Sequence, residues 1–98
     1  MKNKYDISVF VDVSTRQSVQ IEIAKRFKKR RKEQKLSRKA LSIKSDVSYA
    51  SIRRFENTGE ISLSSLLKLA QAMHYLKDFT GLFGNAIVTD LKEYKYDS

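Results

Sequence analysis

The stretch from Ser37 to Asn57 constrains the fold of this chain more than any other, because it predicts two short helices joined by a tight turn. Ser37 can cap the first helix, which we expect to run to about Lys44, since a serine oxygen takes up a backbone N–H that a helix start leaves unpaired. The break falls at Asp46, one of the few residue types besides glycine that tolerates a left-handed backbone. The chain therefore turns sharply after the first helix.

A second short helix follows this turn. Ser48 can cap it, it extends to about Glu56, and Asn57-Thr58-Gly59 is its stop signal. The apolar positions of the two helices would hold them at a fixed angle over a shared core; they are Leu41, Val47, Ile52 and Phe55. A short helix, a tight turn and a second capped helix make up the helix-turn-helix pattern.

Residues at fixed spacing along this stretch also match the pattern of a known family; they are Leu36-Ser37, Leu41, Val47-Ser48, Ile52, Phe55-Glu56-Asn57 and Gly59. With them, the segment resembles the helix-turn-helix domain of the lambda-repressor/Cro-like regulators, the xenobiotic-response-element (XRE) type. The resemblance covers roughly residues 23–83 and implies an all-α, five-helix domain that binds DNA. Four positions depart from the family pattern: Arg38, Ser42, Asp46 and Thr58.

The remaining helices are expected to complete a DNA-binding domain over residues 18–84. Apolar residues at helical spacing predict a first helix over Ser18–Gln34, a fourth helix after a cap at Ser62, and a fifth helix over Leu76–Phe83. In the fifth helix three apolar residues would close the core, or would lie in a dimer interface as the same region does in related repressors; they are Phe79, Leu82 and Phe83.

The segments that flank this domain have a different pattern. From Ile7 to Val13 every odd position is Ile or Val, which predicts a short β-strand within an N-terminal arm of residues 1–17. A strand needs a partner edge. We expect the same strand of a second subunit, and the alternatives are the C-terminal tail of residues 85–98 or an arm that frays.

The net charge of the 98-residue chain is +9, and its placement indicates a polyanion as partner. Residues 25–39 hold ten Lys or Arg against one Glu, so this segment carries the whole excess. A basic cluster of this kind is typical of a nucleic-acid-binding protein. The alternative is a solvated helix face that aids solubility.

The residue types present argue against catalysis, metal binding and a membrane span. With no Cys and one His, the chain offers no thiolate zinc site and no nucleophile–base pair, and it has no Gly-rich phosphate loop. We therefore expect no enzyme activity, no metal and no cofactor. No apolar run approaches the ~18 residues of a transmembrane helix, and no signal peptide is found at the start, so a cytoplasmic protein is expected.

The resemblance implies how DNA would be read. In this family the second helix of the motif enters the major groove, where each base pair displays its own pattern of donors and acceptors. Carried over by position, the base-facing residues would be Tyr49, Ala50, Ser51 and Arg54. Arg54 can donate two hydrogen bonds to a guanine, and Ala50 can contact a thymine methyl.

Phosphate contacts would fix the register of the protein on DNA. The helix start after Ser37 favours an anion, and Arg38 takes the place of a glutamine that in relatives bridges phosphate and base. The expected phosphate-contacting residues are Lys35, Ser37, Arg38, Lys39, Arg53, Asn57 and Thr58.

Arg31 falls on the apolar side of the first helix, where an unpaired buried charge would cost several kcal/mol or so. The resemblance implies that Arg31 forms a structural ion pair with Glu56, at the end of the recognition helix. The alternative is that the Arg31 side chain extends to water.

These features predict a regulator that binds double-stranded DNA sequence-specifically, most simply a homodimeric repressor on an inverted repeat, since one domain covers only a half-site. The same domain also serves as the DNA-binding antitoxin of toxin–antitoxin pairs, so a partner toxin is the alternative. Two other classes stay open. One binds RNA or an acidic protein through the basic helix alone, and the other lies on a membrane surface, against which Arg31 and the lack of Trp argue.

Overall fold

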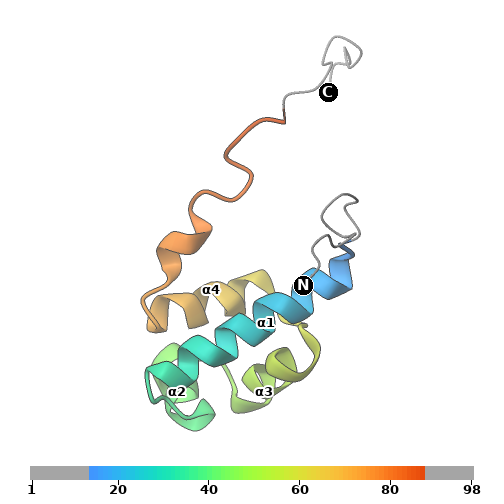
Figure 1. Cartoon of the computed structure of the whole chain (residues 1–98). Coiled ribbons are helices and arrows are strands. Elements are labelled where there is room, and N and C mark those ends of the chain that lie inside the picture. Colours follow the sequence, from blue (N-terminus) through green and yellow to red (C-terminus); the bar gives the residue numbers. More distant parts are fainter. Residues whose placement is uncertain (1–13, 88–98) are drawn as a thin grey trace.

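The computed structural model describes residues 14–87, which form four α-helices and one short 3-10 helix (Figure 1). They are α1 (Arg16–Glu33), α2 (Arg38–Ser45), α3 (Tyr49–Thr58), α4 (Leu63–Ala72) and the 3-10 helix η2 (Leu76–Phe79). Among the described residues the fold is all-α, as predicted. The predicted strand over residues 7–13 lies outside them. None of the described helices is both long enough and apolar enough to cross a membrane.

Each α-helix starts after a hydroxyl side chain that accepts the backbone N–H three residues further on; these N-caps are Thr15, Ser37, Ser48 and Ser62. At α1 the exchange is reciprocal, because Ser18 Oγ accepts the N–H of Thr15 at 2.9 Å. This capping box makes α1 begin two residues earlier than predicted, with Ser18 inside the first turn.

Left-handed residues end the two helices of the motif. Asp46, at φ 66°, follows α2, and Gly59, at φ 82°, follows α3. A Cβ on Gly59 would come within 2.9 Å of the backbone carbonyl carbon of Gln20 in α1. Glycine is therefore required twice here, for the backbone angle and for the close approach of α1. Gln20 Nε2 also donates to the Gly59 carbonyl oxygen at 2.9 Å, which attaches α1 to the end of α3.

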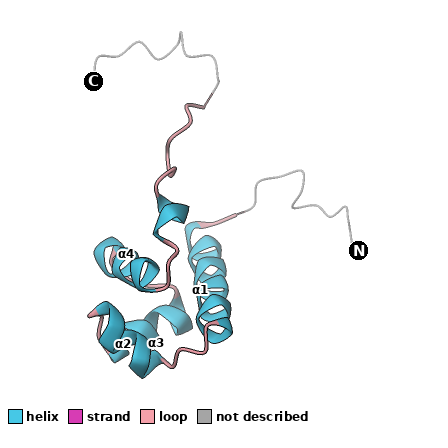
Figure 2. Ribbon diagram, turned by 90° about the vertical axis from the view of Figure 1, so that its left-hand side faces the viewer, coloured by secondary structure: helices cyan, strands magenta, loops and turns pink. Residues whose placement is uncertain are grey.

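The core lies where α1 crosses α3 and where α2 packs against α3 and α4 (Figures 1 and 2). The rings of Phe27 in α1 and Phe55 in α3 meet edge to face, with their centroids 5.2 Å apart. The four apolar positions predicted for the motif are all buried, together with residues of α1 and α4; the core side chains are Ala24, Leu41, Val47, Ile52, Phe55, Leu69 and Met73. This packing fixes α3 against α1 and α2.

The prediction of a fifth helix over Leu76–Phe83 was wrong in length and in type. Only Leu76–Phe79 form a single 3-10 turn, and no side chain caps it. Leu82 is 58% exposed and Phe83 is exposed as well, so neither closes the core. Gly81 and Gly84 interrupt the segment, and a glycine inside a helix costs about 1 kcal/mol relative to alanine. After η2 the described chain leads away from the helices (Figure 1).

Candidate nucleic-acid interface

Helix α3 turns one side to the core and the other to solvent. Ile52 and Phe55 are buried, whereas the residues between and before them point outward. Of the four positions predicted to face bases, Tyr49, Ala50 and Arg54 are exposed and Ser51 is half-buried. The exposed side thus includes the N-terminal half of α3, the part that enters the major groove in helix-turn-helix proteins.

Ser51 belongs to the cap of α3 as much as to its exposed side. Its backbone N–H donates to Ser48 Oγ at 3.0 Å, and its hydroxyl accepts from the Ser48 hydroxyl at 2.9 Å. The same residue that is predicted to contact a base therefore helps to fix the start of the helix. Its hydroxyl keeps one hydrogen to donate, since a hydroxyl both accepts and donates.

Arg54 is held by an ion pair that sequence reasoning missed. Its Nη2 donates to Oε1 of Glu60, in the loop after α3. Thr58 places that loop, because its hydroxyl donates to the Arg54 carbonyl oxygen at 2.7 Å and accepts the Glu60 N–H at 3.1 Å. The Thr58 hydroxyl, predicted to contact a phosphate, is thus engaged within the protein. In the DNA-free protein Arg54 is therefore directed toward Glu60.

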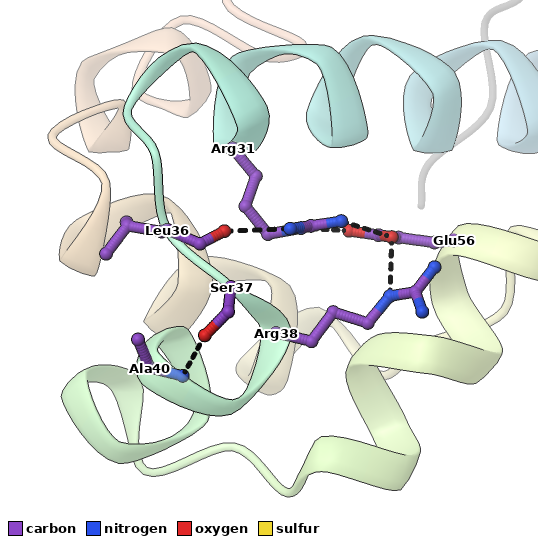
Figure 3. Close-up of polar contacts among 6 residues, drawn as sticks. All are labelled: Arg31, Leu36, Ser37, Arg38, Ala40 and Glu56. Atoms are coloured by element: carbon purple, nitrogen blue, oxygen red, sulfur yellow. Dashed lines mark hydrogen bonds and ion pairs between the residues drawn. The ribbon is translucent and has the colours of Figure 1, made fainter.

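A buried carboxylate links three helices (Figure 3). The Glu56 side chain is 0% exposed. Arg31 donates two hydrogen bonds to its carboxylate, from Nε to Oε2 at 2.6 Å and from Nη2 to Oε1 at 3.0 Å. Arg31 Nη1 donates to the Leu36 carbonyl oxygen at 2.8 Å. Arg38 adds a hydrogen bond from Nε to Oε1 at 2.9 Å, which the family pattern did not imply. Glu56 therefore joins α3 to both α1 and the start of α2.

The Glu56 carboxylate and the Arg38 guanidinium each stabilise the charged form of the other. Burial alone would raise the pKa of the Glu56 carboxyl, but hydrogen bonds from Arg31 and Arg38 outweigh it and hold that pKa below its ordinary value of 4.5. The Glu56 carboxylate raises the pKa of Arg38 against the opposing effect of burial, and the Tyr49 hydroxyl adds to the increase. One carboxylate faces two guanidinium groups, so one positive charge remains beside the exposed side of α3.

The other predicted phosphate-contacting side chains are exposed; they are Lys35, Lys39, Arg53 and Asn57. Ser37 is exposed too, but its Oγ accepts the Ala40 N–H at 2.9 Å as the cap of α2 (Figure 3). Arg38 is half-buried, since Nε is bound to Glu56. A phosphate at the start of α2 would therefore meet the remaining guanidinium nitrogens of Arg38 rather than the whole group.

Between residues 14 and 87 no three His, Cys, Asp or Glu side chains gather in a way that could hold a metal ion. Two open hollows, of about 500 and 810 Å³, are lined by α4 with residues outside the motif. The exposed side of α3 borders neither of them.

A comparison with protein families supports the same region as the functional one. The family model that matches describes a helix-turn-helix, and the match covers residues 27–76, half of the chain. It includes all of α2, α3 and α4 together with the second part of α1. Searches of curated proteins and of solved structures gave no significant match.

Proposed function

Since the chain belongs to the lambda-repressor/Cro-like, XRE-type helix-turn-helix family of DNA-binding transcription regulators, we propose that it is a dimeric repressor. In this proposal each subunit places α3 in the major groove of one half of an inverted repeat. Tyr49, Ala50, Ser51 and Arg54 face the bases, and the exposed basic residues around the motif bind phosphates.

The observation that carries the proposal is the orientation of α3. Its apolar side is fixed against two helices, α1 and α2, while Tyr49, Ala50 and Arg54 stand on the exposed side. A helix held this rigidly can present side chains to base edges with a defined register. The basic residues that precede α3 in sequence supply the charge that attracts a phosphate backbone.

A dimer is supported by apolar side chains that the single subunit leaves uncovered. Leu63 at the start of α4 is 65% exposed, and together with Leu67 and Leu76 it lines the hollow of about 500 Å³. The lining of this hollow includes one charged residue, Lys68. A second copy would cover this surface and supply the second half-site reader that specific binding normally requires.

The test is a genomic DNA pull-down with the purified full-length protein, followed by sequencing of the bound fragments. Salt at ~150 mM suppresses binding through phosphates alone. Recovery of one short inverted repeat supports the proposal, and the Arg54→Ala variant should lose that enrichment while it keeps its fold. Recovery of fragments with no shared sequence contradicts it and favours a partner bound by the basic helix alone.

Repression is tested separately with a reporter gene behind the recovered site. The wild-type protein should lower expression of the reporter, and Arg54→Ala should not. An increase in expression with the wild-type protein would make the protein an activator.

A second candidate function is that of a DNA-binding antitoxin, which would also bind and neutralise a partner toxin. It is favoured by the hollow of about 810 Å³ that lies outside the motif, since a partner bound there would leave α3 free. Co-expression with the product of the neighbouring gene, followed by co-purification, tests this function. Absence of a stable complex would argue against the antitoxin function and favour a repressor without a partner toxin.

A further inference from the structure

A groove separates α1 from α4, and none of residues 14–87 covers it. Its volume is about 810 Å³, and its lining comes from α1, α4 and the segment around η2, with none from α2 or α3. Ile23, one helical turn before Phe27 in α1, is 38% exposed here. The floor is apolar and includes Ile23, Phe27, Leu66, Met73, Tyr75 and Phe79. A full fifth helix would have provided cover for such a surface, but η2 is only one turn long.

The rim of the groove on the α1 side is basic. Four positively charged residues line it, Lys25, Arg26, Lys29 and Arg30, against the acidic residues Glu22 and Asp78. Arg26 pairs with Glu22 at 3.4 Å, and Arg30 pairs with Glu33 at 3.2 Å, both within α1. Lys25 and Lys29 have no ion-pair partner among residues 14–87. They are therefore available to a negatively charged ligand.

We propose that this groove binds an acidic amphipathic helix of a partner protein. The α1 wall from Glu22 to Arg30 is roughly 12 Å long at 1.5 Å per residue, close to the distance between positions i and i+7 of a bound helix. The side-chain ridges of a third helix can pack into a groove that two helices form. Acidic residues beside the apolar stripe of that helix would meet Lys25 and Lys29. The inference rests on the second, partner-binding candidate function and names the chemistry of the partner.

Charge argues against a second copy of this chain as the occupant. Two grooves placed face to face would bring the four basic residues of one α1 close to those of the other, and like charges across an interface are unfavourable. The described chain does not fill the groove either, since beyond Leu82, which still lines it, the chain runs away from α1 and α4 (Figure 1). A polyanion without apolar groups would leave the floor uncovered.

The experiment uses the full-length protein and a fluorescein-labelled synthetic peptide of about four helical turns, with Leu at i, i+3, i+4 and i+7 and Glu on both flanks. A scrambled peptide of identical composition is the reference, and binding is followed by fluorescence anisotropy. The patterned peptide should bind, and the scrambled one should bind at least about tenfold more weakly.

Two variants locate the binding site. Lys25→Glu combined with Lys29→Glu should weaken binding about tenfold or more, since each change removes an attraction and adds a repulsion. Lys32→Glu combined with Lys44→Glu makes the same change in net charge at exposed positions outside the groove and should have little effect. Ile23→Ser should also weaken binding, with urea denaturation as a check that its fold is kept.

Three outcomes would overturn the inference. Equal binding of the patterned and scrambled peptides, or equal weakening by the two charge variants, would show attraction by net charge alone. A lower molecular mass of Ile23→Ser in solution would make a second copy the occupant. The peptide titration contains no DNA and no neighbouring gene product, so its failure is separate from failure of the pull-down or of the co-purification.

Discussion

Arg38 donates its Nε–H to Oε1 of Glu56 at 2.9 Å, from the first residue of α2 to the buried side of α3. Glu56 also holds Arg31, so a single carboxylate sets how α1, α2 and α3 meet. The residues of α3 that we propose to face bases depend on that arrangement, because a rotation of α3 would turn them away from the major groove. In this proposal the stability of the fold and the geometry of DNA reading share one side chain.

Glu56→Gln is expected to destabilise the protein by about 3 kcal/mol, because it leaves the charge of the buried Arg31 uncompensated. Urea denaturation at neutral pH measures the change. Glu33→Gln is the matched control, since it removes an equal charge from an exposed pair with Arg30 and should cost less than about 1 kcal/mol. An equal loss of unfolding free energy in both variants would show that the buried pair contributes no more to stability than the exposed one.

The contribution of Glu56 should disappear in acid. Its pKa is lowered in the folded protein, so the unfolded chain takes up the proton first as pH falls. The stabilisation is present above the ordinary value of 4.5 and is lost as pH falls through the lower folded pKa. Urea denaturation of wild type and Glu56→Gln should therefore give a constant difference from about pH 7 to 5 and a shrinking one below. A difference that grows in acid would contradict this sign.

Arg54 and Glu60 should have opposite effects on DNA binding. Arg54→Ala is expected to weaken binding to the recovered site by about 1–3 kcal/mol and to relax preference at one base pair. Glu60→Gln frees Arg54 from its ion pair and should strengthen binding, by less than about 1 kcal/mol because the pair is exposed. Glu22→Gln removes the same charge from the exposed pair with Arg26. Fluorescence anisotropy with the labelled DNA site measures all three variants, and Glu22→Gln should leave the base preference of Arg54 unchanged.

Gly59→Ala should destabilise the protein by about 2 kcal/mol or more, because it combines a left-handed backbone with crowding against α1. Gly81→Ala is the control, since a Cβ there meets nothing within 4 Å, and its effect should stay within about 0.5 kcal/mol. Thermal denaturation of the two variants checks the comparison. Similar midpoints would mean that α1 can shift to accommodate the added methyl group.

Leu63→Glu should dissociate the proposed dimer, because it places a charge on the uncovered apolar side of α4. Light scattering at micromolar concentration should give the mass of one chain for this variant and of two chains for the wild type. Ile43→Glu makes the same change on α2, where Ile43 is also exposed, and should leave the dimer intact. A wild-type protein with the mass of one chain would end the dimer proposal.

The motif itself could be predicted from sequence because its signals are local. Ser37 and Ser48 as caps, Asp46 as the left-handed residue and the buried Ile52 all act within one or two turns of their own position. The end of α3 was placed two residues early, at Glu56, because three stop residues follow one another. The helix continues to Thr58, since it is Gly59 that supplies the left-handed backbone.

Contacts that depend on tertiary placement could not be predicted. Glu60 reaches Arg54 only because Gly59 turns the chain and the Thr58 hydroxyl holds the loop, which no helical spacing signals. The sequence predicts that Arg38 contacts a phosphate, but it does not reveal the hydrogen bond from Arg38 to Glu56 in α3. Ile23 lies four residues before Phe27, the spacing of a core residue, but is partly exposed, and the 3-10 turn Leu76–Phe79 that replaces the predicted fifth helix leaves it so.

The four hydroxyl caps have a practical consequence for handling the protein. Hydrogen bonds donated by the backbone to uncharged side chains do not weaken as ionic strength rises, and the buried Glu56 pair is screened far less than exposed charges. Binding to phosphates weakens steeply with salt. Concentrated salt should therefore strip bound nucleic acid from the protein while every described α-helix keeps its start, which gives a clean preparation without refolding.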